Sequence, residues 1–182
     1  MINDQDILEE NRQVLRRRHR LLVGSKGVDV ARLGLSPEAA VELKSLDPIQ
    51  VDRAADAVSP LFGFDLEDQI IRLLQDPPLV HLSAPSVFES EMLDDATLLL
   101  VNRWTSCRQS PSFSGTVLGM SRRLISVLAS ATYLDVKRVA AQGVRPSLCV
   151  RPQYLFHAGR NIVLQRSQRT NMAVCNTRFN AF

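Results

Sequence analysis

The sequence predicts a mainly α-helical protein made of two tandem helical repeats, each with a helix-turn-helix-like unit, and a short C-terminal β-hairpin. Two observations favour the helical class: apolar residues recur at helical spacing, and helix-start and helix-exit residues punctuate them. A third observation, an internal self-match, predicts the tandem arrangement. With 182 residues, 45% of them hydrophobic and 23% charged, the chain can bury the core of one domain or two small ones.

The self-match joins two segments that lie 85 residues apart. Residues 8–55 align without a gap over residues 93–140, and Leu-Gly-Leu-Ser at 33–36 meets Leu-Gly-Met-Ser at 118–121. After one inserted residue the alignment continues, with residues 60–64 over residues 146–150. Matching at a fixed offset predicts an internal duplication.

Each repeat is expected to contain the same elements in the same order. A long amphipathic helix comes first, and a polar break and a short helix that ends at the Leu-Gly pair follow it. Ser36 and Ser121 are expected to cap the next helix, with Pro37 at its first position in the first repeat. Further helices are expected to begin near Asp47 and Thr132, and extended segments at 61–66 and 147–151 close the repeats.

The expected organisation has four parts. Residues 1–76 form the first helical unit, and residues 77–92 a proline-rich linker with a short strand at 79–82. Residues 93–151 form the second unit, and residues 152–182 a basic tail. In this tail, residues 154–164 are typical of a β-hairpin, and the last fifteen residues are expected to be loose.

The charge of the chain is divided unevenly along its length. Residues 1–102 carry 10 basic and 18 acidic side chains, whereas residues 103–182 carry 12 basic side chains and one acidic side chain, Asp135. Nineteen of the 22 basic residues are arginines, which suit phosphates and guanine edges. This division favours a polyanion as the partner of the second half. The alternative is that the two halves neutralise each other.

The second repeat has the residue types that a DNA-reading helix-turn-helix needs. Gly115 is expected where two helices approach, residues 118–120 form an apolar-glycine-apolar turn, and Ile125 and Leu128 point the second helix inward. The second helix opens with two arginines, at the end that reaches base edges. The predicted DNA-contacting residues are Ser121, Arg122, Arg123, Ser126, Lys137, Arg138, Arg145 and Arg151. The alternative is a solvated basic face beside a core helix.

The first repeat lacks these features. It has Val30 at the position of the small residue, Pro37-Glu38 in place of the two arginines, and Glu42 and Asp47 further on. Carboxylates repel a phosphate backbone, so this repeat is expected to serve dimerisation or partner docking. A plain structural helix pair is the alternative.

Other classes of protein fit the sequence poorly. The three cysteines and three histidines have no ligand spacing for zinc, and no glycine-rich phosphate loop or catalytic arrangement is present. No apolar stretch is long enough to span a bilayer, and the N-terminus is acidic. We therefore expect a cytoplasmic protein that is not an enzyme, has no cofactor and does not enter a membrane.

The segments 31–36, 43–46 and 61–65 resemble the D subunit of the bacterial flagellar master regulator, the FlhD family. The resemblance covers residues 8–75 and, more faintly, 93–151. It implies an all-helical, dimerising transcription activator that works with a zinc-bearing partner subunit, and distant relatives activate transfer of conjugative elements. Two departures stand out: the family has a single copy of this unit, and its intersubunit cysteine would fall near Pro60.

The sequence therefore predicts a bacterial DNA-binding transcription regulator, an activator, that reads the major groove through the helix starting at Ser121. The expected partners are double-stranded DNA, a second copy or a second regulator subunit, and RNA polymerase. The competing hypothesis is an antiactivator or adaptor that docks a transcription regulator without binding DNA.

Overall fold

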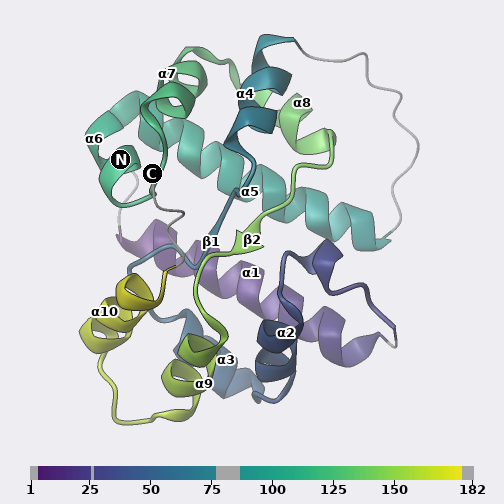
Figure 1. Ribbon diagram of the computed structural model, residues 1–182, viewed down its shortest axis with the longest axis vertical. Helices are drawn as coiled ribbons and strands as arrows, with labels where there is room; N and C mark the ends of the chain where they lie inside the picture. The colour runs from purple at the N-terminus through teal and green to yellow at the C-terminus, as the bar shows by residue number, and fades with distance from the viewer. Residues whose placement is uncertain (1–3, 26, 77–86, 178–182) are drawn as a thin grey trace. The chain divides into compact units, whose positions relative to one another are not determined.

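The computed structural model describes residues 4–25, 27–76 and 87–177, and it confirms the mainly helical class (Figure 1). The described residues form ten α-helices, one short 3₁₀ helix and one antiparallel sheet of two strands. The first half contains α1 (Asp4–Gly24), η1 (Ala31–Leu33), α2 (Pro37–Lys44), α3 (Pro48–Ala55), β1 (Phe62–Gly63) and α4 (Glu67–Gln75). The second half contains α5 (Val87–Gln109), α6 (Pro111–Thr116), α7 (Arg122–Ser130), α8 (Tyr133–Ala141), β2 (Ser147–Leu148), α9 (Pro152–Arg160) and α10 (Arg166–Asn176).

The two halves have the same order of elements from the long helix to the helix after the strand. The expected helix starts are confirmed: the Ser36 hydroxyl accepts from the Ala39 N–H, and the Ser121 hydroxyl accepts from the Leu124 N–H. Asp47 and Thr132 each open a capping box, on α3 and α8. The duplication that this order suggests stays a prediction.

Glycine serves the same purpose in both expected turns. Gly34 has φ of 66° and Gly119 has φ of 65°, in the left-handed region that a side chain disfavours. In the first half, the Gly34 N–H donates to the Ala31 carbonyl and ends η1. Gly34 thus ends η1 in a conformation that glycine adopts readily, whereas α6 ends at Thr116, before Gly119 is reached.

The chain divides into two compact units at positions that differ from the expected boundaries. Unit 1 is the described part of Phe64–Pro146, and unit 2 comprises the described parts of Asn3–Gly63 and Ser147–Phe182. Helix α4, which we assigned to the first repeat, packs on α7 and α8, while α9 packs on α2 and α3. Unit 1 thus includes α4 from the first half of the chain, and unit 2 includes α9 and α10 from the second half.

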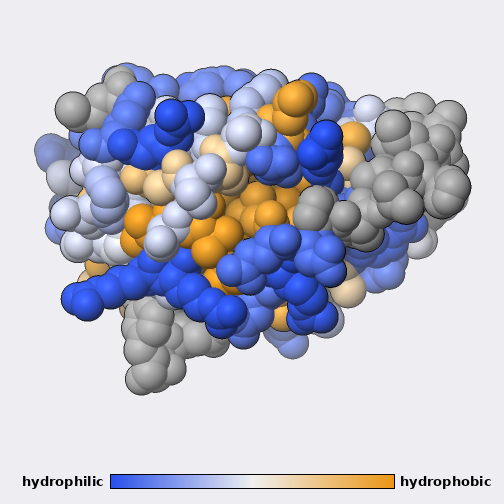
Figure 2. Space-filling model, turned by 90° about the horizontal axis from the view of Figure 1, so that it is seen from above, coloured by the Kyte–Doolittle hydropathy of each residue, from blue (hydrophilic) through white to orange (hydrophobic). Residues whose placement is uncertain are grey.

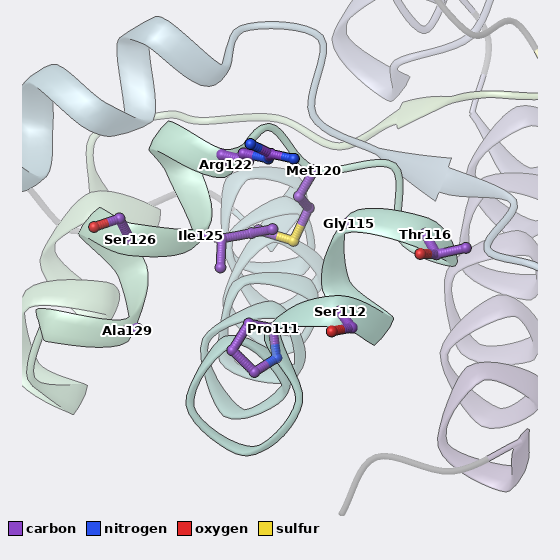
Figure 3. A pocket seen from close by; sticks show the side chains of 9 residues that line it. All are labelled: Pro111, Ser112, Gly115, Thr116, Met120, Arg122, Ile125, Ser126 and Ala129. Atoms are coloured by element: carbon purple, nitrogen blue, oxygen red, sulfur yellow. The ribbon is translucent and has the colours of Figure 1, made fainter.

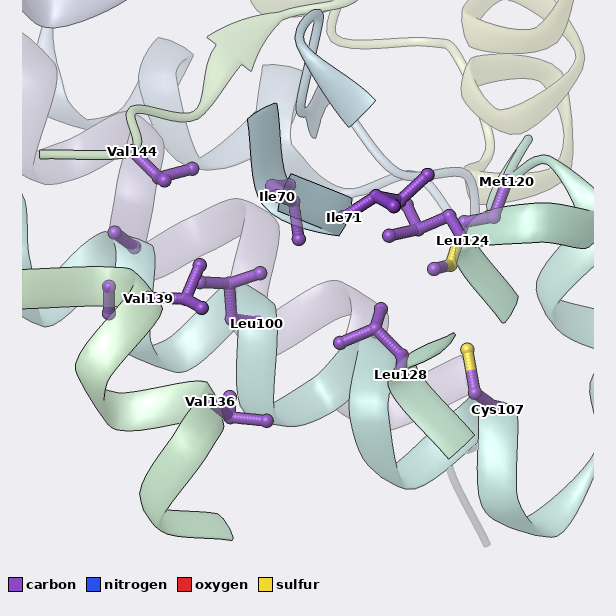
Figure 4. Packing of buried hydrophobic residues seen from close by; sticks show 12 residues of the cluster. Ile70, Ile71, Leu100, Cys107, Met120, Leu124, Leu128, Val136, Val139 and Val144 are labelled. Atoms are coloured by element: carbon purple, nitrogen blue, oxygen red, sulfur yellow. The ribbon is translucent and has the colours of Figure 1, made fainter. Parts of the chain in front are cut away.

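The core of unit 1 explains why α4 belongs there. Ile70 and Ile71 of α4 are 0% and 2% exposed and join a hydrophobic cluster with Leu100 of α5, Leu124 of α7 and Val136 of α8 (Figure 4). Burying this apolar face is the main gain available to a helix of nine residues, which is too short to be stable alone.

Unit 2 is joined by contacts between residues far apart in the sequence. The buried Tyr154 hydroxyl of α9 donates to the Ala54 carbonyl of α3 at 2.7 Å, and burial raises the pKa of this phenol. Strands β1 and β2 pair antiparallel, Phe62 with Leu148. Phe62 and Leu148 are counterparts in the self-alignment, whereas the second pair, Gly63 with Ser147, is not.

A fully buried asparagine in α1 organises the segment before β1. The Asn11 side-chain amide donates to the carbonyls of Ala57 and Ser59, and its oxygen accepts from the Leu61 N–H, all at 2.9 Å. Three otherwise unpaired backbone groups of this segment are thereby satisfied away from water.

The expected C-terminal hairpin is wrong. The segment forms α9, whose Tyr154, Leu155 and Ala158 are buried on one helix face, and Arg166–Asn176 forms α10 where we expected loose chain. Ile162 and Val163, which we assigned to the second strand, are 72% and 81% exposed. The apolar runs in this segment are too short to distinguish the periodicity of a strand from that of a helix. The segment is helical because this buries its apolar face against α2 and α3.

The linker expected at residues 77–92 is shorter than predicted, because α5 begins at Val87 and includes residues 87–92. The strand expected at 79–82 lies outside the described residues. Among the described helices, none combines the length and the hydropathy that crossing a bilayer requires.

Candidate nucleic-acid interface

The candidate site is the outer face of α7 in unit 1. Leu124 and Leu128 of α7 are buried against the core, while Arg122, Arg123 and Ser126 are exposed. Of the two residues expected to point inward, Leu128 is buried, whereas Ile125 is half-buried and lines a groove beside α6. A helix anchored by one apolar face presents its polar face rigidly, which a reader of base edges needs.

The helix before the turn is short, as expected, but it ends at Thr116 and not at the Leu-Gly pair. Helix α6 has six residues, shorter than α7 with its nine. A methyl group added at Gly115 would lie 3.6 Å from Ile125 Cδ1, an ordinary contact. The two helices come together at Gly115 as expected, but the approach leaves room for an alanine.

The structure brings only some of the other predicted contacts near α7. Lys137 and Arg138 lie exposed on α8 and Arg145 on the segment after it, all in unit 1. Arg151 belongs to unit 2 and is not part of the same compact body. Arg138 pairs with Asp135 at 3.3 Å, so part of its charge is compensated locally.

Two carboxylates of α4 meet the start of α7, and sequence reasoning missed both. The Ser121 N–H donates to the Glu67 carboxylate, at 3.2 and 3.3 Å from its two oxygens. Arg123 Nη1 lies 3.6 Å from Asp68 Oδ1, and both side chains of this pair are largely exposed. The Ser121 N–H, the first donor of α7, is therefore already bonded to an anion.

The uneven charge along the sequence does not persist in the folded units. Unit 1 spans 8 basic and 9 acidic residues, and unit 2 spans 14 basic and 10 acidic residues. The exchange of α4 and α9 places acidic residues of the front half beside basic residues of the rear half. Any attraction for a polyanion thus depends on local arrangement and not on the net charge of a domain.

A groove of about 610 Å³ runs between α6 and α7 on the same face. Met120 and Ile125 point toward one another at its centre, and Ser112 and Thr116 lie on its α6 side (Figure 3). The lining residues are Pro111, Ser112, Gly115, Thr116, Met120, Arg122, Ile125, Ser126 and Ala129. The face seen in Figure 2 has hydrophobic side chains at its centre and hydrophilic ones around them.

Aromatic and cationic side chains form a second feature that the sequence analysis did not single out. Arg108 lies over the Trp104 ring at 5.1 Å, and Lys137 lies over the Tyr133 ring at 5.7 Å. Both pairs have the i, i+4 spacing of neighbours on a helix, a signal present in the sequence. The two rings are 6.1 Å apart, and the Trp104 indole N–H donates to the Ala131 carbonyl, so this cluster ties α5 to the turn between α7 and α8.

The Asp135 carboxylate provides a test of the cap on α8. It accepts from the Thr132 hydroxyl at 2.6 Å and from the Thr132 N–H at 3.0 Å, which together with Arg138 lowers the pKa of Asp135. The ionised Asp135 therefore stabilises the folded state. This stabilisation is present above the unfolded pKa of about 3.9 and is lost as the pH falls through the lowered pKa of the folded protein.

We expect Thr132→Ala to raise the pKa of Asp135 toward its ordinary value, measured by NMR titration of the carboxyl carbon. Arg138→Ala should raise it less, because the exposed charge pair is screened by solvent. An unchanged Asp135 titration in Thr132→Ala would contradict the assignment of the hydroxyl as the main cause.

The described residues contain no group of three or more histidine, cysteine or acidic side chains placed to hold a metal. Cys107 is buried in the unit 1 core, and burial raises the pKa of its thiol. A thiol of this kind is a packing element and a poor nucleophile.

Comparisons with known proteins add no relative. No family model matches the chain, and neither a curated protein nor a solved structure resembles it closely enough to count as a match.

Proposed function

We propose that the chain is a DNA-binding transcription regulator of bacterial type, an activator, in which α7 enters the major groove. The observation that supports it most is the outward face of α7, where Arg122, Arg123 and Ser126 stand exposed above the buried Leu124 and Leu128. Arginine at the start of such a helix can contact guanine edges and phosphates together.

Lys137, Arg138 and Arg145 would supply sequence-independent contacts to phosphate from the same unit. The similarity to the FlhD family, drawn from residues 31–36 and 61–65, supports the class of regulator. We further propose a cytoplasmic location, contact with RNA polymerase, and assembly as a dimer or with a second regulator subunit.

We expect the double variant Arg122→Glu/Arg123→Glu to bind DNA about 100-fold more weakly than the wild type, since two base or phosphate contacts become repulsive. The slope of log affinity against log salt should fall by about two. The probe is the DNA that copurifies with the wild-type protein from cells, sequenced and used in a gel-shift titration.

The matched control is Arg12→Glu/Arg20→Glu, which makes the same charge change on α1 of unit 2. It should keep most of the wild-type affinity. Equal binding by Arg122→Glu/Arg123→Glu and the wild type would refute the assignment of α7.

A second candidate function is supported by the groove between α6 and α7. Its apolar centre at Met120 and Ile125, with Arg122 at its edge, suits an apolar side chain followed by a carboxylate of a partner protein. Under this hypothesis the chain is an antiactivator or adaptor. Elution from heparin at low salt would favour the adaptor, because a DNA-binding protein is retained.

A further inference from the structure

The contact between α4 and the start of α7 has the form of a capping box completed by another helix. In an ordinary box, the third residue of the helix returns a carboxylate to the N–H of the cap residue. That position in α7 is Leu124, which has no such group, and Glu67 of α4 accepts from the Ser121 N–H instead.

The Ser121 N–H that Glu67 binds lies at a helix N-terminus, a place where proteins commonly bind phosphate. Phosphates bind at helix N-termini because the first N–H groups and the helix dipole attract an anion. Here the Glu67 carboxylate is the anion at Ser121, and Asp68 pairs with Arg123, one of the two arginines proposed to contact DNA.

The two carboxylates differ in exposure, because Glu67 is half-buried and Asp68 is exposed. Ile70 and Ile71 anchor α4 in the unit 1 core, so the helix itself stays beside α7. The side chains of Asp68 and Arg123 are 86% and 68% exposed, and the Asp68 carboxylate can therefore swing away without disturbing the core.

We propose that Glu67 and Asp68 form an autoinhibitory contact that competes with DNA phosphate for the Ser121 N–H and for Arg123. This inference rests on the proposed function of α7. A phosphate that binds there must displace both carboxylates, so the contact weakens binding to every DNA duplex. Only DNA sites that make further contacts with unit 1 then form stable complexes.

The test removes the two charges and keeps the shape. Glu67→Gln retains an oxygen that accepts from the Ser121 N–H, and Asp68→Asn changes an exposed side chain, so the fold is preserved. The matched control is Asp65→Asn/Asp76→Asn, which makes the same change of charge at exposed positions on either side of α4.

Binding to a short mixed-sequence DNA duplex is measured by fluorescence anisotropy over a series of salt concentrations. We expect Glu67→Gln/Asp68→Asn to bind roughly three- to tenfold more tightly than the wild type, and the control to change at most about twofold. Equal tightening by both variants, or none by the first, would overturn the proposal.

A readout without DNA separates this proposal from the proposed function. Inorganic phosphate is titrated while the Ser121 amide signal is followed by NMR. If phosphate shifts the Ser121 signal of Glu67→Gln/Asp68→Asn much more than that of the wild type, the competition is supported. This holds even if no variant binds DNA, and in that case only the proposed function fails. Equal responses in both proteins would overturn the competition whatever the DNA result.

Discussion

Replacing Asn11 by leucine is expected to lower the free energy of unfolding by about 4 kcal/mol, a large share of the total for a protein of this size. The side chain lies fully buried and bonds the Ala57 carbonyl, the Ser59 carbonyl and the Leu61 N–H. Leucine has a similar volume but satisfies none of them, and each unpaired buried group costs about 1–3 kcal/mol.

The loss is measured by urea unfolding followed through the helical circular dichroism band. Gln13→Leu is the control on the same helix, because Gln13 is exposed and bonds only the neighbouring Glu9 among the contacts described for it. It should change stability by less than about 0.5 kcal/mol. Similar losses in the two variants would show that Asn11 does not organise the segment before β1.

Replacing Gly159 by valine is expected to cost about 3 kcal/mol through overpacking. Gly159 is buried on α9, and a Cβ there would lie 3.0 Å from the Gln50 carbonyl oxygen and 3.0 Å from Leu46 Cδ1. The backbone oxygen cannot rotate away, so α9 must shift from the α2–α3 turn.

The same urea experiment applies, with Gly24→Val as the control, since a Cβ at Gly24 has no neighbour within 4 Å. The control should unfold close to the wild-type midpoint. A Gly159→Val protein as stable as the wild type would mean that α9 can move away from the α2–α3 turn at little cost.

Local chemistry made the helix boundaries predictable. Ser36, Ser121 and Thr132 each bond a backbone N–H three residues further on, within the reach of a single turn. The buried side of α7 was predicted in part, because Leu128 is buried as expected, whereas Leu124 takes the inward place that we gave to Ile125. Such features depend on residues close together in the sequence.

The features that sequence reasoning missed depend on distant residues. Glu67 meets Ser121 across 54 positions, and Tyr154 meets Ala54 across 100. The periodicity of α4 and α9 indicates that each must bury an apolar face but does not say which surface will cover it. The hairpin error has the same origin, because only packing distinguishes a short buried helix from a strand.

The division of the chain also sets the order in which the units can be completed during synthesis. Unit 1 is one continuous stretch, but α1 to α3 of unit 2 are translated before Ser147–Leu148 and α9, on which they pack. Until α9 leaves the ribosome, the surface around Leu46 and Ala54 that it covers lacks these contacts. Chaperones that shield nascent chains are therefore expected to engage the first sixty residues for longer than the middle of the protein.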